Sequence, residues 1–247
     1  MNQGSQRFYR RMMVRPGLHG FGVKVKETDL WIQAQTPLES LARELVLLHR
    51  SHLERYAENN PNFLVTLVPW LLHGPAPPIV RDMTEAGRLA GVGPMAAVAG
   101  AVAEAVGKGL LPFSKEVIVE NGGDVFLQIS GPITAAIYAG ASPLSCKVGI
   151  TVPCKPGSMG ICTSSGSVGH SLSMGRADAV VVVSPSCGLA DAVATAVGNR
   201  VHTPADIGAA IEQGRKIPGV LGLVVIMEDR MGSWGDLELV PLSVKKP

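Results

Sequence analysis

The sequence is poor in aromatic residues and in charge, and each shortage excludes a class of protein. Its 247 residues include three Trp, three Tyr and five Phe, so the core must be built from small aliphatic side chains that pack closely. The 22 basic and 20 acidic residues leave a formal net charge of +2, without a block of like charge. Nucleic acid is bound through a strongly basic face, so it is not an expected partner.

The cysteines lack the arrangement of a structural site. There are four of them, Cys146, Cys154, Cys162 and Cys187. They show no CxxC spacing and no neighbouring His, which argues against a zinc site and against a disulfide framework. We expect reduced thiols in a cytoplasmic protein.

Long hydrophobic runs are missing as well. The most apolar stretches, 62–72 and 94–106, are shorter than the ~20 residues that a spanning helix needs, and Pro69 and Glu104 interrupt them. The N-terminal stretch carries charge but no apolar region behind it, unlike a signal peptide. We therefore expect no membrane partner, and we expect both apolar stretches to be buried in the core.

Periodicity places helices early in the chain and strands late. Residues 21–34 alternate like a hairpin, and from 116 onward short β-rich runs dominate. The segment 95–107 is rich in Ala and Gly on all faces, which predicts a buried central helix. This order indicates an α+β fold rather than a doubly wound sheet. We expect one unit over 1–247, with two lobes as an open alternative.

The expected helices follow from spacing and capping signals. Thr36 to Glu39 has the pattern of a capping box, with Pro37 at the first helical position. Apolar residues then recur at helical spacing up to about residue 60. The other expected helices cover 79–90, 95–107, 188–198 and 205–214.

Asp191 and Thr195 stand four residues apart in a predicted helix, and so they share one face of it. A carboxylate and a hydroxyl are hard oxygen ligands for Mg²⁺, which needs few protein ligands when phosphates supply the rest. The alternative is structural: an Asp favoured by the helix dipole and a Thr bonded to its own helix. Spacing alone favours the structural alternative.

A second motif runs from Cys162 to Ser171 as CTSSGSVGHS. Successive backbone N–H groups in such a Gly- and Ser-rich loop can form a nest for a diphosphate, and His170 could donate to it or move a proton. A plain polar turn between two strands explains the same residues. A Ser/His hydrolase is disfavoured because there is no GxSxG elbow.

Asn121-Gly122-Gly123-Asp124 lies between two apolar runs and has the form of a hairpin turn. In a ligand site, its glycines would let the backbone approach a flat ring, and Asp124 could bind a ring edge or a ribose. By contrast, the GxGxxA pattern at 91–96 lacks the preceding strand that a dinucleotide fingerprint requires. We therefore favour close helix packing as the role of those glycines.

Taken in order, several strings resemble the ApbE family of FAD-dependent FMN transferases, and most closely a cytosolic branch of it. They are ETDLWIQA, GVGPMAAVAG, VENGGD, TSSGSVGHS and LADAVATA. The resemblance to the branch covers nearly the whole chain, and the resemblance to the enzymes covers about its central half. It implies an ApbE-like fold, with sheets and helices packed around a buried Ala/Gly-rich helix.

The resemblance also implies ligands and roles. Asp191 and Thr195 would hold Mg²⁺, His170 would be the catalytic residue, and FAD or FMN would be the bound nucleotide. An acceptor protein is implied as a partner, and self-association is an open expectation. The residues implied to bind the cofactor are Asn121, Gly122, Gly123, Asp124, Thr163, Ser164, Ser165 and Gly166.

The chain departs from the enzymes near the catalytic end of the motif. The family His is followed by Asp-Pro-x-Thr-Gly, whereas His170 is followed by Ser-Leu-Ser-Met-Gly, and the family Lys-Gly is Ala99-Gly100 here. Two functions stay open. One is a Mg²⁺-dependent flavin or nucleotide-diphosphate binding protein that transfers or hydrolyses its ligand. The other is a non-catalytic accessory protein of cofactor or sulfur metabolism that keeps the fold.

Overall fold

The computed structural model describes residues 15–153, 157–166 and 174–242, and it contains two antiparallel sheets, the larger of which has helices on one face and the smaller sheet on the other. The helices are α1 (Glu39–Asn59), α2 (Pro78–Ala90), α3 (Val98–Leu110), α4 (Cys187–Gly198) and α5 (Ile207–Gly214). Short 3-10 turns, η2 (Pro61–Leu64), η3 (Pro94–Ala97) and η4 (Pro204–Asp206), precede or link them. Antiparallel sheets with helices packed on one side make the protein α+β, as the sequence predicts.

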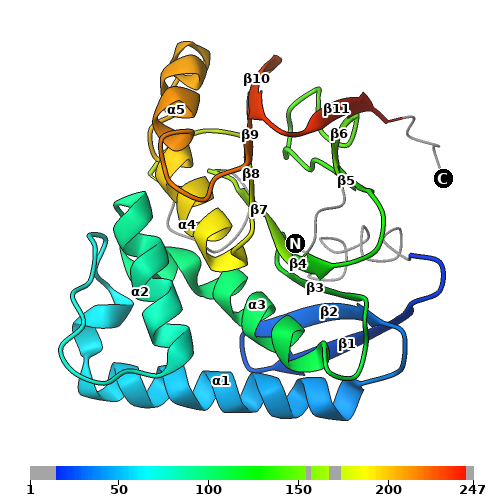
Figure 1. The fold of residues 1–247 in the computed structure, drawn as a ribbon. Helices are drawn as coiled ribbons and strands as arrows, with labels where there is room; N and C mark the ends of the chain where they lie inside the picture. Colours follow the sequence, from blue (N-terminus) through cyan, green and yellow to red (C-terminus); the bar gives the residue numbers. More distant parts are fainter. Residues whose placement is uncertain (1–14, 154–156, 167–173, 243–247) are drawn as a thin grey trace.

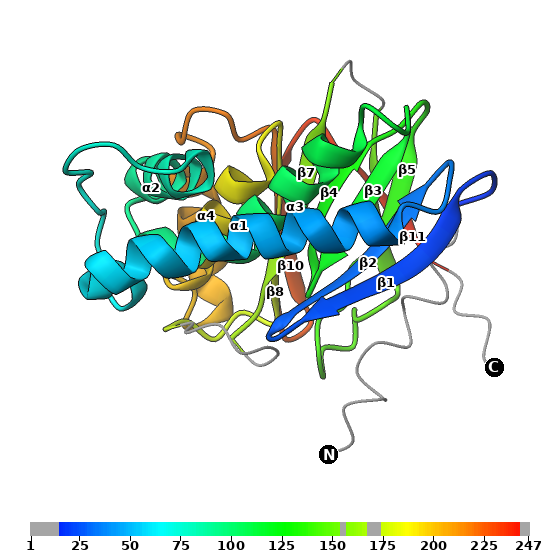
Figure 2. The same cartoon turned by 90° about the horizontal axis from the view of Figure 1, so that it is seen from below.

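The larger sheet has the strand order β1-β2-β3-β4-β7-β8-β9-β10. Its strands are β1 (His19–Val25), β2 (Thr28–Ala34), β3 (Val117–Asn121), β4 (Asp124–Gln128), β7 (Met159–Ser164), β8 (Ala179–Ser184), β9 (Gly222–Met227) and β10 (Arg230–Gly235). The smaller sheet pairs β11 (Glu238–Pro241), β6 (Val148–Val152) and β5 (Ile133–Ala136). Figures 1 and 2 show how the helices and the two sheets are arranged.

Side-chain alternation divides the core into two layers. Val180 and Val182 of β8 pack with the helices, whereas Val181 and Val183 pack with the smaller sheet. All six residues of β8 are consequently buried, which explains its continuous apolar sequence.

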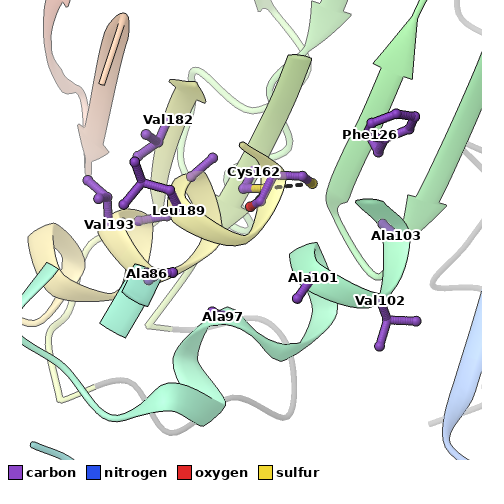
Figure 3. Packing of buried hydrophobic residues seen from close by; sticks show 14 of the residues in the cluster. Ala86, Ala97, Ala101, Val102, Ala103, Phe126, Cys162, Val182, Leu189 and Val193 are labelled. Atoms are coloured by element: carbon purple, nitrogen blue, oxygen red, sulfur yellow. Dashed lines mark hydrogen bonds between the residues drawn. The ribbon is translucent and has the colours of Figure 1, made fainter. Parts of the chain in front are cut away.

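The Ala/Gly-rich helix α3 lies at the centre, between α1, α4 and the strands β3 and β4. Gly107 allows this approach, since a Cβ there would overlap the ring of Phe126. Figure 3 shows Phe126 beside the α3 residues Ala101, Val102 and Ala103. The sequence prediction of a buried central helix is confirmed.

One local expectation is wrong, and one strand has no counterpart in the sequence analysis. α1 begins at Glu39 with Leu38 as its N-cap, and no side chain caps it, so the capping box at 36–39 does not form. The strand β10 is not predicted by the sequence, because it lies at the sheet edge with exposed and half-buried residues in alternation.

The apolar stretch 62–72 also differs from its prediction. Phe63 is fully buried, but Val65 and Leu71 are 71% and 70% exposed. The backbone there has no regular secondary structure after η2, so there is no helical or strand face to turn its aliphatic side chains inward together.

Within the described ranges, no single helix is both long and apolar enough to cross a membrane. α2 and the following η3–α3 segment meet that test only when taken together, and they are bent by 105° at their junction.

Candidate functional site

The predicted site residues on the described strands and turns lie at one end of β3, β4 and β7. Gly122 and Gly123 form the two-residue turn between β3 and β4, with φ of +69° and +118°. Both angles favour glycine and fit a tight hairpin. The turn sets Asn121 opposite Asp124, and both side chains follow the alternation of the helix-facing residues.

The register between β4 and β7 brings the second motif to this turn. Val125 pairs with Ile161, so Asp124 lies beside Cys162 and Gly123 beside Thr163. A Cβ at Gly123 would be 3.7 Å from the carbonyl oxygen of Thr163. Cys162 and the backbone of Thr163 lie near enough to Asp124 to lower the pKa of its carboxyl group, against the larger effect of burial. The NGGD turn and the TSSG segment are therefore neighbours in space.

Helices α3 and α4 cap each other above these strands. Asp191 Oδ2 of α4 accepts a hydrogen bond of 2.9 Å from the Gly100 N–H in the first turn of α3. Glu104 Oε2 of α3 accepts from the N–H groups of Cys187 (2.7 Å) and Gly188 (3.2 Å), which begin α4. Part of the role of Asp191 is thus structural, but it lies within α4 and accepts from the start of α3, whereas the structural alternative in the sequence analysis places it at the N-terminus of its own helix.

The turn between β3 and β4 is hydrogen-bonded to the start of α3 as well. Asn121 Nδ2 donates to the Ala99 carbonyl at 3.0 Å, one residue before the amide that Asp191 accepts from. Asn121 and Asp191 consequently meet at the beginning of α3, although 70 residues separate them in the sequence.

Burial disfavours the negatively charged form of both aspartates. Burial raises the pKa of Asp124 to about 7, with a further contribution from the charge of Glu120. Burial also raises the pKa of Asp191 well above its ordinary value, and the charge of Asp124 adds to this rise. Asp124 Oδ1 is buried without a hydrogen-bond partner in the described structure. Such a carboxylate pair favours a bound cation.

Thr195 lies one turn after Asp191 and is 8% exposed. In the described part of the chain, no group of three or more His, Cys, Asp and Glu is arranged to hold a metal. A cation here would therefore take few ligands from side chains. That is how Mg²⁺ is usually held, with waters and ligand phosphates completing its shell.

The TSSG segment lies at the end of β7, near the last turn of α4. A Cβ at Gly198 would be 3.9 Å from Ser164 Oγ. The Gly166 N–H donates to the Ala177 carbonyl at 2.9 Å, so this amide is not free for the anion nest that the sequence suggests. His170, the predicted catalytic residue, lies outside the described residues.

Shape alone does not identify this site. One of the two described depressions lies between the sheets and is lined by Leu127 and Met159, among others. The other, of about 570 Å³, lies between η4 and the β9–β10 turn. Neither depression is lined by the residues discussed above. The candidate site is therefore defined by its acidic residues and by the proximity of the turn, β7 and α4.

Two thiols lie next to the aspartates of the candidate site. Cys162 Sγ lies 3.4 Å from Cys187 Sγ and 3.2 Å from the Cys187 carbonyl oxygen. Both residues are free and buried, and Figure 3 shows Cys162 packed below the start of α4. Burial raises the pKa of Cys187 to about 11 and that of Cys162 well above its usual value.

These thiols should react slowly. Because thiolates are the reactive form, we expect iodoacetamide to alkylate Cys162 and Cys187 on the order of 100-fold more slowly than the half-buried Cys146. Peptide mass spectrometry over a time course at neutral pH measures the three rates. Modification of Cys162 or Cys187 as fast as that of Cys146 would show that the thiol pair is open to solvent.

Comparison with known proteins places the chain in a family. The family model described as "AbpE bacteria" matches residues 11–231. A "UPF0280 protein" of Methanocella arvoryzae is 39% identical over 215 residues, 87% of each chain. Another, of Methanocaldococcus jannaschii, is 40% identical over 223 residues, 87% of this chain and 91% of that one.

Solved structures share the fold at low sequence identity. The flavin transferase ApbE from Vibrio cholerae matches with a TM-score of 0.57 and 14% identity, over 88% of this chain and 96% of that one. The apo flavinyl transferase ApbE of Pseudomonas stutzeri gives 0.55 and 14%, over 88% and 93%. This chain therefore belongs to the family described as AbpE bacteria and has the ApbE-like fold that its motifs predict.

Proposed function

We propose that the protein binds a flavin nucleotide diphosphate such as FAD together with a divalent cation, and that it transfers the FMN part to a hydroxyl acceptor. The observation that carries this proposal is the buried pair Asp124 and Asp191, in which the charge of Asp124 helps to raise the pKa of Asp191. Asn121 lies nearby and donates to Ala99 at the start of α3. The shared fold with two ApbE flavin transferases supports the ligand class by analogy.

The residues present fit a divalent cation. Asp191 Oδ2 accepts from Gly100, and Thr195 can add its hydroxyl as a ligand from the same helical face. Asp124 lies close enough to raise the pKa of Asp191, so its charge also favours the cation. When bound, Mg²⁺ would neutralise the diphosphate and stabilise the charge that develops on it.

The glycine turn fits a ligand that approaches the backbone. The space around a Cβ at Gly122 is open to 4 Å, while Asn121 is held to α3 and fixes the turn from the other side. The Thr163 and Ser164 end of β7 supplies polar groups next to the turn. We assign the flavin nucleotide to this edge, between the turn and α4.

The transfer step requires little covalent chemistry from the protein. The acceptor hydroxyl oxygen would form a bond to the phosphorus on the FMN side, the P–O bond to AMP would break, and the hydroxyl proton would leave to a base or to water. We assign the proton transfer to His170, because it follows the TSSG segment in the sequence. A water in place of the acceptor would give hydrolysis to FMN and AMP.

The second candidate function is binding without turnover. Ala99-Gly100 and the residues after His170 differ from the enzyme pattern. The acidic residues of the candidate site, Asp124 and Asp191, are nevertheless present. A carrier or accessory protein would keep the site and lack the transfer.

Incubation of the purified protein with FAD and Mg²⁺ distinguishes these functions. We expect AMP release together with FMN, either free or covalently attached to protein, and we expect EDTA to abolish it. AMP and FMN are measured by chromatography and covalent flavin by in-gel fluorescence. Stoichiometric FAD binding without AMP would support the carrier, and the absence of both would exclude a flavin ligand.

A further inference from the structure

Residues 61–72 form a surface segment that contains no charged side chain. We call it the apolar segment. In Figures 1 and 2 it is the cyan stretch at the edge of the molecule, after α1 and before α2. Five of its aliphatic side chains are half to almost three-quarters exposed: Leu64 49%, Val65 71%, Leu67 55%, Val68 65% and Leu71 70%.

The fold holds this segment in a fixed conformation. Phe63 packs edge-on between Tyr56 and Trp70, with ring centroids at 5.1 and 5.9 Å. The indole N–H of Trp70 also donates to the Tyr56 hydroxyl at 3.1 Å. Its aromatic side chains therefore anchor the segment, and its aliphatic side chains are left outside.

A backbone hydrogen bond and a close contact with Gly93 also hold the apolar segment in place. Thr66 N–H donates to the Asn62 carbonyl at 3.0 Å, and a Cβ at Gly93 would overlap the Thr66 carbonyl oxygen. Gly93 immediately precedes η3, so the backbone of the apolar segment lies directly against the backbone before η3, with no space for a side chain between them. The exposure of the aliphatic side chains is a property of the native fold.

The size of the exposed surface fits a protein interface. Five side chains at these exposures present on the order of 500 Å² of apolar surface, about as much as the largest patch of a typical monomer. A standard interface buries about 800 Å² per partner around an apolar centre. The apolar segment can supply that centre, with its neighbours forming the rim.

We propose that the apolar segment is the centre of an interface between two copies of this chain. A two-fold contact places the same patch against itself, and a patch without charge meets no like-charge repulsion there. It also offers no charge pattern by which an acidic or basic partner could be recognised. This inference is independent of the proposed function.

Sedimentation velocity and light scattering on the full chain, from roughly 1 to 100 μM, test the interface. We expect the wild type to have twice the 25.8 kDa mass of the chain. Val68→Glu and Leu71→Glu should each weaken the dimer by about 100-fold or more, because each would bury a charge. Both side chains are mainly exposed, so the melting temperature of the monomer should stay unchanged.

Phe113→Glu is the matched control. Phe113 is 61% exposed in the turn after α3, outside the apolar segment, and its substitution should leave the dimer intact. A wild type that is monomeric at about 100 μM would overturn the proposal, whether or not it binds lipid vesicles or another protein. Dimers of both Glu variants that are as tight as the wild type would overturn it as well.

Discussion

Asp191→Asn should raise the thermal stability of the ligand-free protein and lower its Mg²⁺-dependent affinity for FAD by about 100-fold, on the order of 3 kcal/mol. The amide keeps an oxygen for the Gly100 N–H, so the start of α3 remains capped. It removes a buried charge whose pKa is raised by desolvation and by Asp124. The substitution thus separates the structural contact from the proposed metal role.

Differential scanning fluorimetry and calorimetric titration with FAD and Mg²⁺ measure the two effects. Asp229→Asn is the control, since Asp229 is an exposed carboxylate near the β9–β10 turn with a long ion pair to Arg230. It should change neither quantity. If Asp191 serves only to cap α3, Asp191→Asn will bind FAD and Mg²⁺ as the wild type does.

Gly100→Ala should destabilise the protein by about 2 kcal/mol or more, even though alanine is the better helix former by ~1 kcal/mol. A Cβ at Gly100 would lie 2.4 Å from the Cys187 carbonyl oxygen and 2.9 Å from Asp191 Cβ. A backbone carbonyl at the start of α4 cannot move away without separating the two helices. Overpacking therefore outweighs helix propensity at this position.

Gly208→Ala provides the matched comparison, because Gly208 is also helical and a Cβ there meets nothing within 4 Å. It should leave stability unchanged or raise it by up to about 1 kcal/mol. For a chain of this length, the Gly100 variant should melt roughly 4–8 °C lower than the wild type. Equal melting temperatures for the two variants would contradict the close contact of α3 with α4.

The sequence predicts most elements of the fold, because its periodic runs are long enough to indicate their class. The alternation in β1 and β2 and the apolar run of β8 give their strands directly. The edge strand β10 is missed because half-buried and exposed residues alternate in it without an apolar run. The apolar segment is misjudged because composition alone suggests burial, while the anchoring of Phe63 by Tyr56 depends on tertiary contacts.

The site is predicted in its parts but not in its assembly. Asp191 is a visible candidate ligand, but its bond to Gly100 joins residues 91 positions apart and no local pattern indicates it. The mutual capping by Glu104 is missed for the same reason. The pairing of β4 with β7, which brings Asp124 to Cys162, comes from sheet topology. Long-range register of this kind cannot be read from spacing.

Calorimetric titration of the wild type with FAD shows whether Asp124 and Asp191 form a cation-dependent nucleotide site. We expect one FAD bound per chain in the presence of Mg²⁺, with affinity lowered by about 100-fold in EDTA, because the carboxylates Asp124 and Asp191 would then repel the diphosphate. FAD binding that is equally strong in EDTA and in Mg²⁺, or no FAD binding at all, would contradict this expectation.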